Sequence, residues 1–299
     1  MTALTTSGEF YSLTVAFVWA GAVVMFRASG VTTPPVALNL FKNTFAVLLL
    51  VPTMLLAGTP FAPPGNGWAD AGILLASGAL GIGVADSLFF ASLNRLGASR
   101  AAVVDGLYSP LIALFAFFYL AEPVGVTLLV AMGLMVLAIL LITWKKDPDD
   151  TPISRRDLRT GILYGILAMV GMTAGIVVAK PVLNRADVLW STTMRLAGGV
   201  AFLLLSMGHR PSRRGVGRAF RPGPHWRLLI PASFVGTYLA MMIWIAGMKY
   251  TDTSTAGVLN QTSVLIVPLL AAFFLKERLT KRKIAAILLG FAGAAIASL

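Results

Sequence analysis

Cysteine is absent from the sequence, which excludes disulfide bonds, thiolate metal sites and cysteine nucleophiles. Histidine is almost absent, because the two that occur, His209 and His225, lie in one basic stretch. No GxxxxGK(S/T) phosphate loop is present, and no Ser, His and Asp set recurs at one depth of the predicted helices. The sequence therefore predicts a protein that is not an enzyme and that holds no cofactor and no metal.

Charge is also scarce, at 12% of the 299 residues, whereas a soluble domain carries about 25%. Hydrophobic residues make up 57%, and the mean hydropathy is +0.83. Apolar runs of about 20 residues with few charges are typical of transmembrane helices. Ten such spans are predicted: Phe10–Ala28, Val36–Ala57, Asp70–Leu93, Ala98–Ala121, Val124–Trp144, Thr160–Ala179, Val188–Met207, Leu228–Gly247, Ser254–Leu275 and Lys281–Leu299.

The chain repeats itself at an offset of 155 residues, which aligns Gly81–Glu122 with Gly236–Glu277 without a gap. Ten spans then divide into five and five, and an odd number forces the second half to enter the membrane from the opposite side. The predicted fold is an all-α integral membrane protein of ten transmembrane helices arranged as two inverted five-helix repeats. We expect repeats at 1–144 and 160–299, joined by a basic loop at 145–159. The identities that carry most weight are Gly81/Gly236, Ser99/Ser254 and Glu122/Glu277.

Basic residues set the orientation. Most of the 24 Lys and Arg residues fall in one set of loops, including the two longest, 145–159 and 208–227. Cytoplasmic loops attract positive charge, so both termini are predicted to be periplasmic, in a bacterial inner membrane. The same rule accounts for the net charge of +12, and no nucleic-acid partner is expected.

Two segments carry a resemblance to a known family. One runs from Ser109-Pro110-Leu111 to Leu120-Ala121-Glu122, and the other from Val267-Pro268-Leu269 to Leu275-Lys276-Glu277. With the basic residues Lys42 and Arg195 early in the second and seventh spans, the chain resembles the EamA-type permeases of the drug/metabolite transporter superfamily over nearly its whole length. It departs from them in having Lys42 instead of the more usual arginine, and in the shorter distance from Pro268 to its glutamate.

The resemblance implies transport of small metabolites, since the family exports amino acids and other metabolites and some members carry drugs or sugars. It also implies a cavity between the third, fourth, eighth and ninth spans. The aromatic, polar and acidic residues of those spans and of the first are the cavity candidates, although plain helix packing is the alternative for each aromatic residue. They are Trp19, Asp86, Phe90, Asp105, Tyr108, Tyr238, Trp244, Asn260, Gln261 and Ser263.

Charges within the predicted spans are costly in lipid and usually functional. Four occur: Lys42, Asp86, Asp105 and Arg195. The depth of Lys42 matches that of both acids, so we expect it to pair with Asp86 or Asp105, as a cytoplasmic gate or as a static structural pair. The second half has no matching acids, because Asp86 corresponds to Met241 and Asp105 to Asn260 at the offset of 155. Four tryptophans near span ends are expected in an interfacial belt: Trp68, Trp144, Trp190 and Trp226.

The predicted function is secondary transport by alternating access, as an exporter of amino acids that include apolar or aromatic ones. The alternatives are a multidrug, sugar or nucleotide-sugar transporter of the same fold, and, from another class, a membrane channel. The expected partners are a small-molecule substrate and membrane lipid. Proton coupling and facilitated transport are equally compatible with the sequence. A complete ten-helix unit needs no second copy, so a monomer is expected.

Overall fold

The computed structural model describes residues 8–30, 33–63, 65, 67–96, 101, 104–143, 153–206, 210–275 and 281–297. Helices account for all the regular secondary structure in these residues. Five described helical segments are long and apolar enough to cross a membrane: Pro35–Leu56, Trp68–Leu96, Arg155–Arg185, Val188–Ser206 and Trp226–Tyr250. Four shorter apolar helices accompany them, while the count of ten spans stays a prediction.

The helices of the predicted first half are α1 (Gly8–Gly30), α2 (Pro35–Leu56), α3 (Trp68–Gly78), the π-helix η1 (Ala79–Ala85), α4 (Asp86–Leu96), α6 (Tyr108–Leu120) and α7 (Val126–Thr143). Those of the predicted second half are α8 (Arg155–Arg185), α9 (Val188–Ser206), α10 (Arg210–Ala219), α11 (Trp226–Ser233), the π-helix η2 (Phe234–Leu239), α12 (Ala240–Tyr250), α13 (Thr253–Asn260), α14 (Thr262–Leu275) and α15 (Lys281–Ala297).

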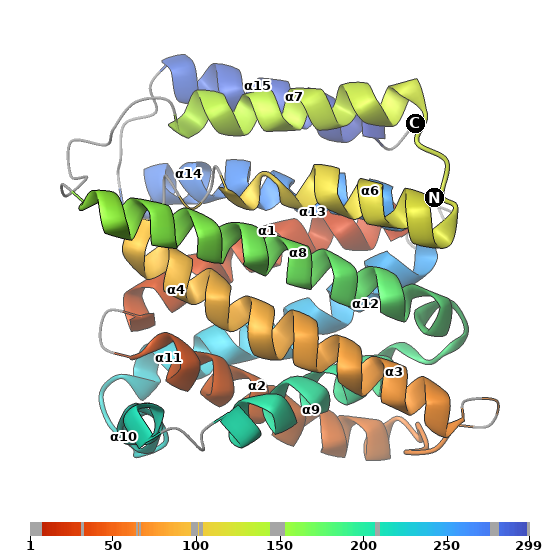
Figure 1. Cartoon of the computed structure of the whole chain (residues 1–299), viewed down its shortest axis with the longest axis vertical. Coiled ribbons are helices and arrows are strands. Elements are labelled where there is room, and N and C mark those ends of the chain that lie inside the picture. The colour runs from red at the N-terminus through yellow and green to blue at the C-terminus, as the bar shows by residue number, and fades with distance from the viewer. Residues whose placement is uncertain are drawn as a thin grey trace.

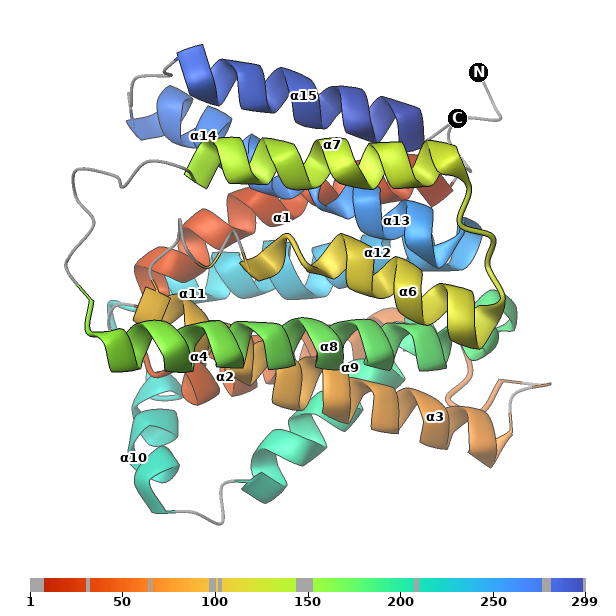
Figure 2. The same cartoon turned by 45° about the horizontal axis from the view of Figure 1, so that its top comes forward.

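The long helices run roughly parallel or antiparallel to one another in stacked layers (Figure 1). The pair α7 and α15 forms one edge of the stack, and α9 and α10 lie at the opposite edge (Figure 2). The start of α1 and the end of α15 lie at the same end of the helices, whereas α10 lies at the other. The first and last described helices thus have their outer ends on one side of the molecule, as the orientation predicted from the basic loops requires.

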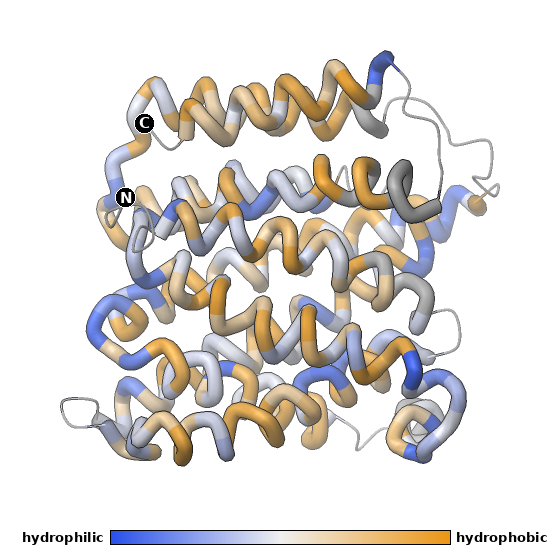
Figure 3. The backbone as a smooth tube through the Cα atoms, turned by 180° about the vertical axis from the view of Figure 1, so that it is seen from behind, coloured by the Kyte–Doolittle hydropathy of each residue, from blue (hydrophilic) through white to orange (hydrophobic). Residues whose placement is uncertain are grey.

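Hydrophobic residues line most of the length of the helices, and hydrophilic segments gather at their ends (Figure 3). Large apolar side chains also face outward, such as Leu56 at 91% exposure and Leu205 at 82%. A soluble protein would bury such a surface, while lipid accepts it without cost. The distribution is that of a protein solvated by a bilayer around its middle.

The two predicted halves interlock. Helix α1 packs against α11, η2, α12, α13 and α14, while α8 packs against α3, η1, α4 and α6. Glycine permits a close approach in each case: a Cβ at Gly236 would meet Phe26 of α1 at 2.5 Å, and one at Gly175 of α8 would meet the Ser77 carbonyl oxygen at 3.0 Å. The first helix of each half therefore lies against the third-span segment of the other half.

The offset of 155 residues recurs in the backbone. The π-helices η1 and η2 begin at Ala79 and Phe234, which are related by that offset. Turns interrupt the fourth- and ninth-span segments at Gly106–Leu107 and at Gln261, again 155 residues apart at Gly106. Short π-helices are rare and concentrate at functional sites, and interrupted helices mark substrate sites in transporters. The sequence pattern predicted the repeat but neither irregularity.

Three sequence expectations are wrong in detail. Helix α8 covers Arg155–Arg185 instead of Thr160–Ala179, because Ser154 caps its start by accepting the Asp157 N–H at 3.0 Å. The predicted loop at 208–227 contains the helix α10. Trp190 is not interfacial: it is 1% exposed, and its Nε1–H donates to the Phe61 carbonyl oxygen at 2.8 Å.

Candidate functional site

Lys42 of α2 pairs with Asp86, the first residue of α4, at 2.7 Å between Nζ and Oδ2. Lys42 is buried, and its ammonium also donates to the Asn43 side chain at 3.3 Å. Asn43 donates in turn to Asn39, whose amide reaches the Ile82 carbonyl oxygen in η1 at 2.8 Å. Of the two acids predicted for Lys42, the structure brings Asp86 to it. The charge is compensated within the predicted first half.

An aromatic cluster lies beside this ion pair. Phe90 is 8% exposed and lies under the Lys42 ammonium, 5.8 Å from Nζ to the ring centroid. Phe26 of α1 contacts both Phe90 and Trp19, with ring centroids 6.4 and 6.2 Å apart. The candidates Trp19 and Phe90 therefore lie in one packed cluster between α1 and α4.

Arg195 of α9 is the counterpart of Lys42, because it lies early in the seventh span as Lys42 does in the second, at an offset of 153 residues. Its surroundings differ. It is 1% exposed, and its guanidinium donates to the Ser77 hydroxyl and, at 3.4 Å, to the Gly175 carbonyl oxygen. The guanidinium carbon lies 5.4 Å from the ring centroid of Trp244, a cation–π arrangement. Among the described residues, no carboxylate forms a salt bridge with Arg195 and its Nε–H has no partner.

Asp105 lies just before the turn that precedes α6, and its backbone carbonyl accepts the Gln261 side-chain amide at 2.8 Å. The interrupted fourth and ninth spans therefore meet at their breaks. Tyr108, three residues further along the chain, is buried, and its hydroxyl has no hydrogen-bond partner among the described residues. It belongs to the apolar core against which Trp244 packs, and Trp244 lies beside the Arg195 guanidinium. We refer to these five residues as the central cluster: Asp105, Tyr108, Arg195, Trp244 and Gln261.

Several polar atoms at the centre have no hydrogen-bond partner among the described residues. Both amide atoms of Asn260 are unpaired, as is Oε1 of Gln261. The Asp105 carboxylate forms no ion pair within the described part of the chain. Buried polar groups are normally paired, so unpaired ones in a transporter-like core indicate a place for a ligand or water. Ser263, the second residue of α14, is also buried.

One candidate belongs elsewhere. Tyr238 of η2 shares a hydrogen bond of 2.8 Å with the Thr53 hydroxyl of α2 and stacks on Phe234. It packs with Leu50 and Leu196 in a separate apolar cluster. These contacts lie between α2 and η2, and the cavity role of Tyr238 stays a prediction.

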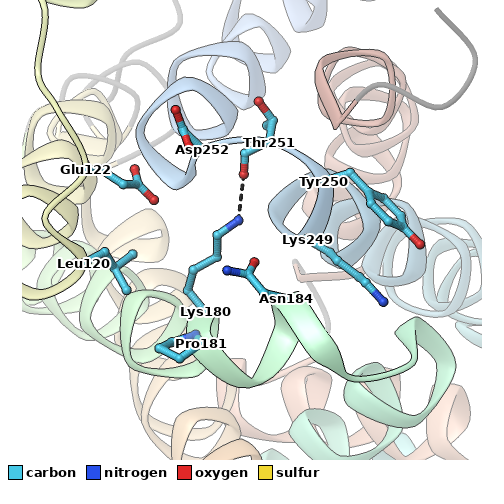
Figure 4. A pocket seen from close by; sticks show the side chains of 9 residues that line it. All are labelled: Leu120, Glu122, Lys180, Pro181, Asn184, Lys249, Tyr250, Thr251 and Asp252. Atoms are coloured by element: carbon cyan, nitrogen blue, oxygen red, sulfur yellow. Dashed lines mark hydrogen bonds between the residues drawn. The ribbon is translucent and has the colours of Figure 1, made fainter. Parts of the chain in front are cut away.

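A second group of charges lies at the predicted periplasmic end (Figure 4). Glu122, beyond the end of α6, accepts the Thr253 N–H at 3.0 Å and the Ser254 N–H at 3.1 Å, and so caps the start of α13. Lys180 of α8 donates to the carbonyl oxygens of Met248 and, at 2.7 Å, of Thr251. An anion at a helix start and a cation at a helix end both complement the helix dipole. Glu122 and Lys180 therefore fix the α12–α13 turn from two sides.

An open pocket of about 660 Å³ lies over this turn, which Figure 4 shows from close by. Lys180 and Glu122 point toward the turn between α12 and α13, and Lys249 donates to the Ala186 carbonyl oxygen at 2.6 Å. The pocket is lined by Leu120, Glu122, Lys180, Pro181, Asn184, Lys249, Tyr250, Thr251 and Asp252.

Glu122, Lys180 and Ser77 were not predicted as site residues from the sequence. Lys180 was expected in a loop, yet it lies in α8 and is 6% exposed. A signal for Glu122 existed, because Glu122 and Ser254 both belong to the strongest repeat identities and they contact each other, with the Ser254 hydroxyl donating at 2.9 Å. Ser77 gave no signal, since a lone serine in an apolar helix is common. No group of His, Cys, Asp and Glu in the described residues could hold a metal ion.

Comparison with known proteins identifies the class. The EamA-like transporter family matches the chain twice, over residues 6–144 and 159–299. Protein PecM of Dickeya dadantii is 27% identical over 233 residues, which cover 76% of this chain and 72% of PecM. Glucose uptake protein GlcU of Bacillus subtilis is 25% identical, with 70% of this chain and 73% of GlcU covered. An uncharacterized transporter of Archaeoglobus fulgidus is 23% identical, with 92% of each chain covered.

The fold agrees with that of a solved crystal structure, at a TM-score of 0.79 and 17% identity, over 97% of this chain and 96% of the other. Both matched segments of the family cover one predicted five-helix repeat each, and the described helices carry the apolar surface of a multi-pass membrane protein. The chain is therefore a small-molecule transporter of the membrane, and it belongs to the EamA-like transporter family.

Proposed function

We propose that the chain exports amino acids, including apolar and aromatic ones, by alternating access. The central cluster is the observation that carries this proposal. It offers a buried cation, an acid without a salt bridge in the described part of the chain and two aromatic rings, and unpaired amide atoms of Asn260 adjoin it. A zwitterion with an apolar side chain supplies the matching charges and apolar surface. The cluster has no second buried cation of the kind that a phosphate ester would require.

Alternating access is supported by the interlocked packing. Because α1 and α8 each lie against the opposite half, a tilt of one half carries the first helix of that half across the third-span segment of the other. The contacts at the two ends differ in kind: Lys42 and Asp86 form an ion pair, while Glu122 and Lys180 hold backbone groups. We propose that the first set restrains the cytoplasmic end and the second set the periplasmic end.

Sugar uptake is the second candidate, and the similarity to GlcU of Bacillus subtilis favours it. Amides and aromatic rings also suit a sugar, because sugars donate and accept hydrogen bonds at their rims and stack through their C–H faces. The buried charges separate the two candidates. A neutral sugar would leave both Asp105 and Arg195 without a counter-charge.

Uptake by the purified chain in liposomes tests the proposal. Labelled leucine and phenylalanine would be compared with labelled glucose, each with an excess of unlabelled competitor. Saturable amino-acid uptake and its acceleration by unlabelled substrate inside the vesicles would support an amino-acid transporter and would exclude a channel. Saturable glucose uptake without amino-acid uptake would replace the amino-acid proposal with the sugar candidate.

A further inference from the structure

The two pseudo-equivalent cations in the membrane are compensated differently. Lys42 has the carboxylate of Asp86 at 2.7 Å. At the offset of 155, Asp86 corresponds to Met241, so the second half presents a thioether where the first presents an acid. Arg195 has only the Ser77 hydroxyl and the Gly175 carbonyl oxygen as hydrogen-bond acceptors among the described residues.

Neutral acceptors reduce the cost of burying a cation, but they supply no opposite charge at hydrogen-bond distance. An uncompensated charge in a low-dielectric interior attracts an anion far more strongly than the same charge does in water. Arg195 is 1% exposed and its Nε–H has no partner in the described structure, so part of its planar donor set is unused. A carboxylate matches that donor set in both shape and charge.

A carboxylate without a salt bridge belongs to the same cluster. Asp105 lies three residues before Tyr108, whose apolar core includes Trp244, the ring beside the Arg195 guanidinium. The Asp105 carboxylate forms no salt bridge in the described part of the chain. Gln261 fixes the backbone at Asp105, while Ser77 and Gly175 fix the guanidinium. The two charges are therefore held separately and do not neutralise each other through a salt bridge.

We infer that Arg195 binds the carboxylate of the transported molecule and Asp105 binds its ammonium group. The central cluster would then recognise an α-amino acid through both of its charged groups. Trp244 and Tyr108 lie beside the two charges and contact the substrate side chain. This inference rests on the proposed amino-acid transport and assigns the residues that determine its specificity. Arg195 is then the specificity residue of the second half, in contrast to the compensated Lys42 of the first.

A set of analogues tests the assignment with the unmodified chain. Uptake of labelled phenylalanine into proteoliposomes would be competed by unlabelled phenylalanine, by phenylalanine amide, which lacks the carboxylate, and by 3-phenylpropionate, which lacks the ammonium group. We expect each analogue to need an about tenfold or greater concentration for half-inhibition, the usual loss for one charged hydrogen-bonded contact. Equal competition by phenylalanine amide would overturn the role of Arg195 while leaving amino-acid transport intact. Absence of any amino-acid uptake would instead reject the proposed function.

Variants then tie each charged end to one residue. Arg195→Gln is expected to remove the discrimination between phenylalanine and its amide, and Arg195→Lys to retain part of it. Asp105→Asn is expected to remove the discrimination against 3-phenylpropionate alone. Arg227→Gln is the matched control, because Arg227 is an exposed arginine outside the cluster. A purely structural role for Arg195 would lower uptake of every ligand and leave the ratio unchanged, which would refute the inference. The analogue series decides the question if Arg195→Gln fails to fold.

Discussion

The carboxylate of Glu122 caps the helix that contains Ser254, by accepting the Ser254 backbone N–H at 3.1 Å and its hydroxyl at 2.9 Å. Both residues belong to the predicted internal repeat, as Glu122/Glu277 and Ser99/Ser254. The contact joins one member of each of these two identities, because a glutamate from the end of one segment satisfies the helix start of another. The counterpart, Glu277 with Ser99, lies outside the described residues.

Replacement of Glu122 by alanine is expected to destabilise the protein by about 2 kcal/mol, because two buried N–H groups and a hydroxyl lose a charged acceptor. Thermal unfolding in detergent, followed by loss of the monodisperse peak, measures the change. Asp252→Asn is the control, since Asp252 lies in the same turn, is exposed and forms no side-chain cap. Equal midpoints for Glu122→Ala and the unmodified chain would refute the capping role.

The Lys42–Asp86 pair is expected to behave as a coupled unit. Removal of either charge, by Lys42→Gln or Asp86→Asn, leaves the other buried without compensation and should cost about 3 kcal/mol. The double variant should cost clearly less than the sum of the two single variants. Unfolding midpoints of the four proteins give the coupling directly. Strictly additive losses would mean that the two charges do not stabilise each other.

Transport assays of the same four proteins distinguish a gating role of the Lys42–Asp86 pair from a purely structural role. A cytoplasmic gate predicts that Lys42→Gln changes the rate of uptake in counterflow at unchanged half-saturation. A static pair predicts that folded variants transport normally. Folded single variants with unimpaired counterflow would therefore remove the gate hypothesis.

Lys180 is expected to restrain opening at the predicted periplasmic end, through its bonds to the carbonyl oxygens of Met248 and Thr251. Because the chain has no cysteine, single cysteines can be introduced as reporters without background. In intact cells, we expect Lys180→Met to increase several-fold the rate at which a membrane-impermeant maleimide labels Asn260→Cys. The control is Asn184→Cys in the open pocket, which should be labelled at the same rate in the unmodified and the Lys180→Met backgrounds. An unchanged rate at position 260 would exclude the restraint.

Helix α9 is expected to tolerate no side chain at Gly198, because an added Cβ would lie 2.0 Å from the Leu75 carbonyl oxygen of α3. Relief requires the two backbones to separate, so Gly198→Ala should destabilise by about 3 kcal/mol or more. Gly72→Ala in α3 is the matched control, since an added Cβ there meets nothing within 4 Å. A helical glycine without such contacts gains up to about 1 kcal/mol on replacement by alanine. Thermal midpoints that change equally in both variants would contradict this account.

Sequence pattern predicted most of the helices, because apolar runs long enough for a bilayer are visible without any neighbour. It missed α10, whose residues are basic and polar and whose helix carries no apolar run. It also misplaced Trp190, since an aromatic residue near a span end looks the same whether lipid or Phe61 receives its N–H. In both cases the missing information lies in the tertiary contacts, which the local composition of the sequence does not reveal.

The sequence predicted the candidate site where the depth of a charged residue in the membrane was enough to indicate its possible partners. Lys42 was expected to pair with Asp86 or Asp105 because all three lay at a similar distance from one face, and in the structure it pairs with Asp86. The partners of Arg195 were not predictable, because Ser77 and Gly175 come from segments distant in sequence and Gly175 offers only a backbone carbonyl. Tyr238 was a reasonable cavity candidate by helical spacing, yet its bond to Thr53 depends on how η2 meets α2. The roles of these residues in transport stay predictions.

The interlocked packing has a consequence for biosynthesis. Helix α1 ends at Gly30, yet the helices that it contacts most begin with α11 at Trp226, near the end of the chain. During translation α1 enters the membrane long before these neighbours are synthesised. Until then its contact surface faces lipid or an insertion factor. The main contacts of α1 therefore form only late in synthesis, and a ribosome that stops before α11 leaves a membrane-inserted fragment whose first helix lacks most of its native partners, a natural substrate for membrane quality control.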